Sequence, residues 1–382
     1  MTEGERNGDT RLTLSVEPMG SSTEIVVQRG VLARLPELLE EHAPAPAYAV
    51  VSDDTVAGLH GGAVSEALEA AGRVTQLFRF PAGETSKSTD TWARLVESFG
   101  EMALGRDGCV VAVGGGVTGD LAGFAAATYA RGIPLVQVPT SLLAMIDASI
   151  GGKTGVDLRA GKNLAGAFHH PRLVVIDPET LETLPDEELR TGLAEAVKHG
   201  VIADADYAAS LHRDATGILG REPAAIDRLV AGSVAIKTAV VGRDAQETGE
   251  RAVLNFGHTI GHGVERATGY AVPHGHAVAM GMVAEARIGE EVGITAVGTS
   301  DRIVAILEAL RLPTALPTHL SPDALIRAAG SDKKAREGVV RYALVDRIGL
   351  PARDADGSWT HAVPEPAVRA ALGPGNGMSG AV

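Results

Sequence analysis

The chain has 382 residues, of which 45% are hydrophobic, and 34 basic against 48 acidic residues give a formal net charge of −14. A chain of this length and composition can bury a large core and divide into two domains. The negative charge disfavours non-specific binding to nucleic acid or to an anionic membrane, so we expect neither as a partner. An anionic small molecule would need a locally basic pocket.

The N-terminal segment is polar and charged. It lacks the apolar core of a signal peptide, and no apolar run in the chain approaches the ~20 residues that span a bilayer. The single cysteine, Cys109, cannot form an internal disulfide bond. These features predict a disordered N-terminus over residues 1–10 and a cytoplasmic protein.

Residues 11–180 alternate short β-rich runs with helical patterns. The runs Ala47–Val51, Cys109–Val113 and Leu135–Val138 are typical of buried strands, and helical patterns such as Thr89–Met102 lie between them. Strands that alternate with helices favour a mostly parallel sheet. We therefore predict an α/β domain over this part of the chain.

A glycine-rich turn at residues 114–119 matches G-x-G-x-x-G between a strand and the helical pattern Leu121–Ala130. Without Cβ atoms the backbone can approach a pyrophosphate, and the helix N-terminus supplies N–H donors. No acidic residue stands ~20 positions beyond the glycines, where the usual ribose contact lies, but Asp53 or Glu84 could fill that role. The turn predicts a nucleotide site, and the alternative is a plain tight turn.

The segment Pro139–Lys162 places Lys153 and Lys162 beside glycines in turn-like surroundings. It is not a P-loop, because Asp147 stands where the first glycine of that motif would fall. A lysine beside flexible backbone suits a phosphate or carboxylate. The alternative is that both lysines are solvated surface residues.

After Asp177 the pattern changes to long amphipathic stretches with few strand signals between them. The stretches are Glu187–Ile202, Ile226–Val241, His258–Thr268 and His276–Val292. We predict a helical domain over residues 181–365. The Gly-rich end of the chain predicts a flexible tail over residues 366–382.

Four of the twelve histidines lie within residues 251–276. His258 and His262 are four apart and share one face of a helix, while His274 follows a loop that can fold back towards them. The glutamate of the HExxH motif is absent between the first two, which argues against a hydrolytic zinc site. The pattern predicts a metal site of another kind. His276 could compete as a ligand, but its position two residues past His274 favours a neighbouring bystander.

Eight separated motifs together resemble one enzyme family, the 3-dehydroquinate synthases among the sugar phosphate cyclases. They occur in the family's order and spacing over about residues 45–350. The motifs are Gly114–Asp120, Arg131-Gly132, Pro139–Lys153, Gly161–Asn163, Gly192–Lys198, Leu254–His258, His274-Gly275 and Asp332–Lys334. The resemblance implies an α/β, Rossmann-like, NAD-binding N-terminal domain and an all-α C-terminal domain that binds substrate and a divalent metal, zinc or cobalt.

The activity that the resemblance implies belongs to the shikimate pathway of aromatic amino acid biosynthesis. The substrate is a small phosphorylated sugar acid, 3-deoxy-D-arabino-heptulosonate 7-phosphate, and the products are 3-dehydroquinate and phosphate. Transient oxidation by NAD, phosphate elimination, re-reduction and an intramolecular aldol closure connect them. Arg131 matches a residue that in the family reaches the neighbouring subunit's phosphate site, which implies a homodimer.

The resemblance assigns the metal ligands as Glu195, His258 and His274. Two neutral imidazoles and one carboxylate leave coordination positions open for substrate oxygens. Glu195 falls on the predicted helix Leu189–Ile202, where a single glutamate could also be a solvated residue. Lys198 lies three residues later and shares its face.

Further site residues follow from the same resemblance, and the basic ones supply the anion pocket. The catalytic candidates are Asp147, Lys153, Lys198, Lys237, Arg251, Asn255 and His262. The substrate-binding candidates are Arg131, Asn163 and one or both of Lys333 and Lys334. From their polar neighbours we expect Lys153 and Arg251 to lie outside the core. For His262 a structural role stays open beside the functional one.

The nucleotide contacts combine Asp53, suggested by its place after a strand, with residues that match the family. They are Asp53, Glu84, Lys87, Gly115, Gly116, Val117, Asp120, Thr140, Ser141, Lys153, Lys162, Thr183 and Leu184. Gly115 and Gly116 would let the backbone approach the cofactor.

Three other interpretations stay open. Another sugar phosphate cyclase of specialised metabolism, such as an amino-dehydroquinate synthase, would share nearly all these motifs. A metal- and NAD-dependent polyol dehydrogenase would release NADH and would not need the lysine cluster. A non-catalytic nucleotide-binding module is disfavoured because metal, cofactor and anion residues are all present.

Overall fold

The computed structural model describes residues 10–16, 21–330 and 340–373. Packing divides the chain into two compact units. Unit 1 comprises Met1–Leu189 and Val230–Gln246, and unit 2 comprises Arg190–Leu229 and Glu247–Val382. The division therefore falls inside helices α6 (Asp186–Ala203) and α9 (Pro223–Arg243), whereas the sequence pattern places a single boundary after residue 180.

Unit 1 is built on a seven-stranded sheet with the order β1-β2-β9-β6-β5-β3-β4. The strands are β1 (Thr10–Val16), β2 (Ser21–Val27), β3 (Ala47–Asp53), β4 (Val74–Phe80), β5 (Cys109–Gly114), β6 (Leu135–Pro139) and β9 (Leu173–Ile176). Every neighbouring pair is parallel except β1 and β2. The mostly parallel α/β domain is confirmed. Thr10 lies in β1, not in a disordered terminus, and residues 1–9 lie outside the described residues.

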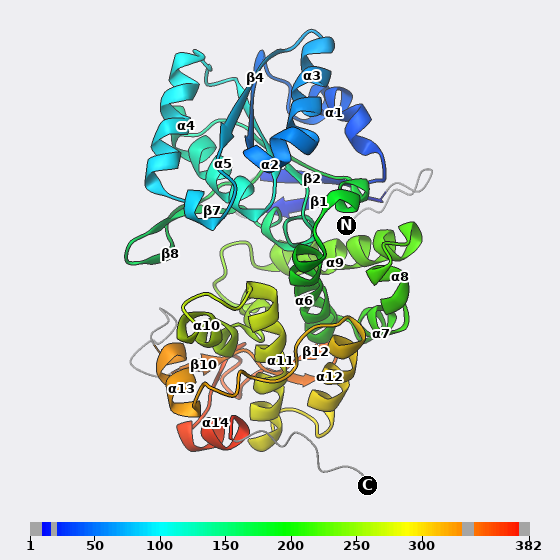
Figure 1. The fold of residues 1–382 in the computed structure, drawn as a ribbon, viewed down its shortest axis with the longest axis vertical. Helices are drawn as coiled ribbons and strands as arrows, with labels where there is room; N and C mark the ends of the chain where they lie inside the picture. The colour runs from blue at the N-terminus through cyan, green and yellow to red at the C-terminus, as the bar shows by residue number, and fades with distance from the viewer. Residues whose placement is uncertain (1–9, 17–20, 331–339, 374–382) are drawn as a thin grey trace. The chain divides into compact units, whose positions relative to one another are not determined.

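Helices cover both faces of this sheet (Figure 1). Helices α1 (Leu35–His42) and α3 (Gly62–Ala70) pack on one face, and α4 (Thr89–Glu101) and α5 (Gly116–Thr128) on the other. Every residue of the central strand β5 is buried. Near-continuous apolar runs such as this one are what a parallel strand covered on both faces requires.

The antiparallel hairpin of β7 (Lys153–Leu158) and β8 (Gly161–Phe168) replaces the turn-like surroundings expected for Lys153, Lys162 and Asn163. Glycine here serves strand pairing as well as turning. A Cβ on Gly155 would lie 2.7 Å from the carbonyl oxygen of the opposite strand. Lys153 therefore begins a strand, and the other two residues lie in the second strand.

Unit 2 is mainly helical, as predicted. In chain order the helices that lie wholly or partly in it are α6, α7 (Ala205–Arg213), α8 (Ala215–Leu219), α9, α10 (His258–Ala267), α11 (His274–Glu291), α12 (Thr299–Ala309), α13 (Pro322–Gly330) and α14 (Glu365–Ala371). Short strands β10 (Arg341–Tyr342), β11 (Val345–Arg347), β12 (Leu350–Pro351) and β13 (His361–Ala362) form two small sheets. Helix α14 occupies the start of the expected flexible tail, and residues 374–382 lie outside the described part.

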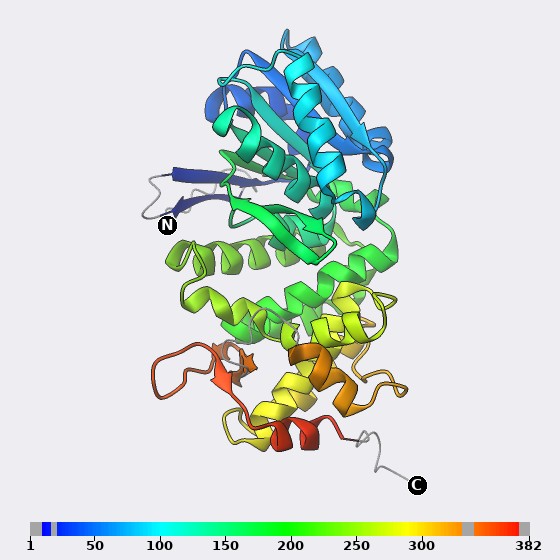
Figure 2. The same ribbon diagram turned by 90° about the vertical axis from the view of Figure 1, so that its left-hand side faces the viewer.

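Helices α10 and α11 pack closely in unit 2 (Figures 1 and 2). A Cβ on Gly261 would lie 3.1 Å from the Ala277 carbonyl oxygen, and one on Gly281 would overlap the Gly257 carbonyl oxygen. Since neither position has a side chain, the two backbones can touch. Buried apolar residues such as Ile260 on α10 and Ile288 on α11 fill the core around the crossing.

Candidate metal centre and nucleotide site

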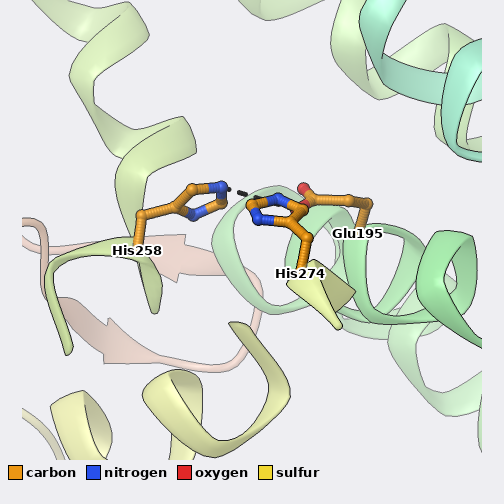
Figure 3. Close-up of side chains that lie close together, drawn as sticks. All are labelled: Glu195, His258 and His274. Atoms are coloured by element: carbon orange, nitrogen blue, oxygen red, sulfur yellow. Dashed lines mark ion pairs between the residues drawn. The ribbon is translucent and has the colours of Figure 1, made fainter. Parts of the chain in front are cut away.

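Three side chains of unit 2 converge from three helices, as Figure 3 shows. Glu195 lies on α6, His258 is the first residue of α10, and His274 is the first residue of α11, directly after the loop that the sequence pattern predicts before it. Glu195 Oε1 lies 3.4 Å from His258 Nε2 and 3.5 Å from His274 Nε2. One donor atom from each residue lies within 4.8 Å of the other two. The structure thus brings together the three residues expected to bind metal.

The donor set fits a divalent cation. Glu195 is 0% exposed, and neither of its oxygens accepts a hydrogen bond of good geometry among the described residues. A buried carboxylate in that condition is costly unless positive charge compensates it. Lys198 Nζ contacts its Oε2 and supplies part of that charge. A carboxylate with two imidazoles is a ligand set of catalytic zinc sites, which keep a coordination position open.

The protonation of these groups follows from their surroundings. Burial raises the pKa of Glu195, but Lys198 and the two imidazoles outweigh burial and hold that pKa well below its usual range. Burial lowers the pKa of His258 well below its ordinary value despite the attraction of Glu195. An ionised carboxylate and a neutral imidazole are the forms that bind a cation.

Each imidazole has a partner on its second nitrogen. His258 Nδ1 donates to the Phe256 carbonyl oxygen at 3.2 Å, and His274 Nδ1 lies 3.4 Å from Glu265 Oε1. Burial lowers the pKa of His274, but Glu195 and Glu265 more than offset burial and raise that pKa to about 10. A proton on His274 Nε2 thus occupies the position that a cation would take.

Two buried glutamates of this region are not among the residues predicted from sequence. Glu265 lies seven residues after His258, so a search of the same helix face could have found it. Fully buried Glu285 on α11 accepts the backbone N–H of Gly257 at 2.8 Å and of Ile260 at 2.9 Å. It therefore caps the first turn of the helix that His258 begins. No local sequence signal marks that contact.

Three other residues of unit 2 singled out from the sequence, His262, Asn255 and His276, differ in their relation to the metal centre. The His262 ring is 5.4 Å from that of His258 and 6.2 Å from that of His274, between ring centroids, so it belongs to the same cluster. Asn255 donates to Glu247 Oε1 at 3.2 Å. His276 belongs to none of the metal-capable groups found among the described residues.

Arg251 corrects one expectation. Its polar neighbours suggest a position outside the core, yet it is 2% exposed. It lies in a 3-10 turn, Glu250–Asn255, whose Val253 and Leu254 are also buried, so the turn as a whole packs into unit 2. Lys153, in contrast, is exposed as expected.

The catalytic and substrate-binding candidates of unit 1 include one close pair. Lys237 on α9 is buried and contacts Asp147, which lies in a π-helical turn. Asn163 in β8 and exposed Arg131 both have positive φ, 54° and 70° respectively. Two further candidates, Lys333 and Lys334, lie outside the described residues.

Several nucleotide candidates of unit 1 lie at or beside the turn between β5 and α5. Gly115 is the N-cap residue of α5 and has no side chain to cap that helix, so the first N–H groups of Gly116 and Val117 can face a ligand. Buried Lys87 contacts Asp120 one turn into the helix.

The glycines of this turn have separate roles. A Cβ on Gly114 would lie 2.7 Å from Thr118 Cβ, and one on Gly119 would lie 2.8 Å from Gln137 Oε1. Position 114 therefore needs glycine for helix-to-strand packing, whereas a side chain at position 119 would require the Gln137 side chain to shift. A Cβ on Gly116 would meet nothing closer than 3.5 Å, which leaves its surface open to a ligand.

The remaining nucleotide candidates have local partners. Asp53 Oδ1 caps the short helix α2 (Asp54–Val56), and its Oδ2 lies 3.5 Å from Thr118 Oγ1. Lys162 Nζ lies 3.5 Å from Glu84 Oε1. Four more follow strands or turns: Thr140, whose N–H donates to the Gly114 carbonyl oxygen, Ser141, and Thr183 with Leu184 at the end of a 3-10 turn.

Comparison with known proteins decides between the open interpretations. Residues 77–191 match the family model of the 3-dehydroquinate synthase N-terminal domain, and residues 192–335 match the model of its C-terminal domain. The 3-dehydroquinate synthase of Symbiobacterium thermophilum is 50% identical over 327 residues, which are 85% of this chain and 91% of that protein. The chain belongs to the 3-dehydroquinate synthase family. The resemblance seen in the eight motifs is confirmed.

Solved structures of related cyclases have the same fold as this family member. The 2-epi-5-epi-valiolone synthase of Streptomyces hygroscopicus subsp. jinggangensis 5008, with NAD+ and Zn2+ bound, is 31% identical with a TM-score of 0.81, covering 91% of this chain and 95% of that one. A 2-deoxy-scyllo-inosose synthase complexed with carbaglucose-6-phosphate, NAD+ and Co2+ has a TM-score of 0.87 at 24% identity, covering 95% and 99%. No helix among the described residues is long and apolar enough to cross a membrane.

Proposed function

We infer that this member of the family is a 3-dehydroquinate synthase, which converts 3-deoxy-D-arabino-heptulosonate 7-phosphate to 3-dehydroquinate and phosphate in the shikimate pathway. The convergence of Glu195, His258 and His274 carries the inference, because it occurs in a chain that matches both domains of the family. The reaction is redox-neutral overall: transient oxidation at C5, phosphate elimination, re-reduction and intramolecular aldol closure.

The cofactors of this function are NAD and one divalent cation, zinc or cobalt. NAD supplies a reversible hydride acceptor, and the cation supplies Lewis-acid polarisation of substrate oxygens. We propose that Glu195, His258 and His274 hold the cation. The ionised carboxylate and the neutral His258 ring support this assignment, since both need no proton loss before they bind.

Basic and amide side chains of unit 2 would hold the substrate. Lys198 lies against Glu195, so its ammonium can stabilise negative charge that develops on a substrate oxygen at the metal centre. Arg251 suits a carboxylate or phosphate, which a guanidinium binds with two parallel hydrogen bonds. Asn255 would orient a hydroxyl group, and His262 would act beside the two histidine ligands.

Side chains of unit 1 would bind further anionic groups and the nucleotide. Asp147 holds the Lys237 ammonium in place, and exposed Lys153 would bind an anionic group directly. The uncapped N-terminus of α5 would bind the cofactor pyrophosphate. We extend the proposal to the other nucleotide candidates, Asp53, Glu84, Lys87, Gly115, Gly116, Val117, Asp120, Thr140, Ser141, Lys162, Thr183 and Leu184, and to Asn163, Lys333 and Lys334 for substrate.

A homodimer in the cytoplasm completes the proposal. Arg131 is exposed on unit 1, at the end of a 3-10 turn, where a second copy could use it. Analytical ultracentrifugation of the purified protein tests the dimer. We expect Arg131→Met to lose activity. If mixing with an excess of an inactive subunit that keeps Arg131 restores the activity, the residue acts across the interface.

Incubation of the purified protein with the heptulosonate phosphate, NAD and Zn2+ or Co2+ tests the function. We expect equal amounts of phosphate and carbocyclic product, with no net NADH. Stoichiometric NADH without phosphate release would indicate a polyol dehydrogenase. Turnover of the amino analogue in place of the heptulosonate would indicate a cyclase of specialised metabolism.

A further inference from the structure

Glu265 is a charged residue of α10 in a nearly buried position. Its side chain is 9% exposed, and charged side chains are seldom buried to this extent without a specific partner. Its two oxygens face different imidazoles: Oε1 lies 3.4 Å from His274 Nδ1, and Oε2 lies 4.0 Å from His262 Nε2. The shorter distance makes His274 the closer partner.

The His274 ring lies between two carboxylates. Its Nε2 faces Glu195 at 3.5 Å, inside the proposed metal centre, while its Nδ1 faces Glu265. A neutral imidazole carries one proton, and the nitrogen that keeps the proton decides which nitrogen can bind a metal. An acceptor at Nδ1 keeps the proton there and leaves the lone pair on Nε2.

We propose that Glu265 is a positioning residue for the metal centre: its carboxylate accepts the Nδ1–H of His274, which fixes the tautomer and the ring orientation that present Nε2 to the cation. The inference rests on the proposed function, since it assumes the cation held by Glu195, His258 and His274. A carboxylate in this place also makes the imidazole a stronger donor to the metal.

The other imidazole ligand, His258, has the same arrangement of its two ring nitrogens. His258 Nδ1 donates to a backbone carbonyl, that of Phe256 at 3.2 Å, so its Nε2 also faces Glu195. Both ligands therefore present the same nitrogen to the centre. Only the acceptor of His274 is a side chain, and only that one carries a charge, so it can be changed by substitution.

The test compares Glu265→Gln with Glu290→Gln in otherwise intact protein. Glu290 lies on the same helix as His274, but its carboxylate accepts the N–H and hydroxyl of Ser300 at 2.8 and 3.0 Å and pairs with no imidazole of the described residues. Competition with a chromophoric chelator gives the Kd for Co2+, and thermal unfolding of the metal-free protein gives the Tm. We expect Glu265→Gln to raise the Kd ~10–100-fold, the usual cost of losing an outer-shell partner, and Glu290→Gln to leave the Kd unchanged.

Three results would overturn the proposal. One is an unchanged Kd in Glu265→Gln, with or without a lower Tm, which would make the residue merely structural. Another is a rise of the Kd for Co2+ in His262→Gln as large as that in Glu265→Gln, which would show that Glu265 acts through His262 and not through His274. The third is failure of both Glu265→Gln and Glu265→Asp to fold in saturating Co2+. The Kd for Co2+ is measured without substrate. If the unsubstituted protein proves inactive but Glu265→Gln still raises its Kd, only the proposed activity is refuted.

Discussion

The nucleotide turn of unit 1 and the metal centre of unit 2 both use helix N-termini, but in opposite ways. Helix α5 begins at the turn with a glycine as its N-cap residue and accepts no side-chain cap from the described residues, so its first N–H groups can bind an anion. Helix α10 begins at the metal centre with its first turn capped by Glu285 from another helix. An open terminus can bind a ligand itself, whereas a capped terminus serves as a rigid support for the side chain of His258.

Loss of a metal ligand should have the largest effect on activity. It should abolish metal binding in unit 2 and leave NAD binding in unit 1 intact. We expect His258→Ala to lose stoichiometric metal and to lower kcat by more than the ~100-fold that outer-shell losses cost. Metal analysis, NAD binding and kinetics measure this, with His276→Gln as the control because that residue belongs to none of the metal-capable groups in the described part of the chain. NAD binding should persist. Full metal content and activity in His258→Ala would contradict the assignment.

Removal of the cap on α10 should have the next largest effect. Glu285→Ala leaves the N–H groups of Gly257 and Ile260 buried without their acceptor, at ~1–3 kcal/mol each, so the free energy of unfolding should fall by ~2–6 kcal/mol. Urea unfolding followed by circular dichroism measures this. Exposed Glu66 on α3 is the control, where Glu66→Ala should change stability by less than ~0.5 kcal/mol. Equal stabilities of the two variants would show that the cap does not support the centre.

Two proposed anion contacts, one in each unit, should respond differently. Arg251→Met and Lys153→Met should each lower kcat/KM at least ~10-fold, because each loses a charge-assisted bond of ~1.5–3 kcal/mol. Only Arg251→Met should also lower the Tm, since Arg251 is buried and Lys153 is exposed. Steady-state kinetics beside thermal unfolding measure both. A folded variant with unchanged kinetics would remove that residue from the anion pocket.

Two glycines of the nucleotide turn should show the smallest effects. A Cβ on Gly116 meets only Ala148 Cβ at 3.5 Å, so Gly116→Ala should keep the Tm but raise the Kd for NAD ~10-fold, or ~1.4 kcal/mol. Gly114→Ala should instead cost ~1–3 kcal/mol of stability, because its Cβ would press on Thr118. Calorimetric titration with NAD and thermal unfolding separate the two. If Gly116→Ala lowered the Tm and Gly114→Ala weakened NAD binding, position 116 would serve packing and position 114 would serve NAD binding.

Local pattern was enough to find several regular elements in each unit. Strands β3, β5 and β6 appear as short apolar runs, and helices α4, α6, α9, α10 and α11 appear as amphipathic stretches, because each element buries a periodic set of side chains. The hairpin of β7 and β8 was missed. Its glycines are needed for close pairing of two strands, and the same glycines in sequence predict turns.

The chemistry of the ligands was also visible in sequence, where Glu195, His258 and His274 stand in motifs of a known family. What surrounds them was not. The buried state of Arg251 depends on the packing of a whole turn, and the bonds from Glu285 to Gly257 and Ile260 join residues that are 28 and 25 positions apart. Sequence therefore determines which residues can bind the metal, and it predicts the helices on which Glu195 and His258 lie. Tertiary structure decides what holds them there, because a buried carboxylate finds its partners only when two helices meet.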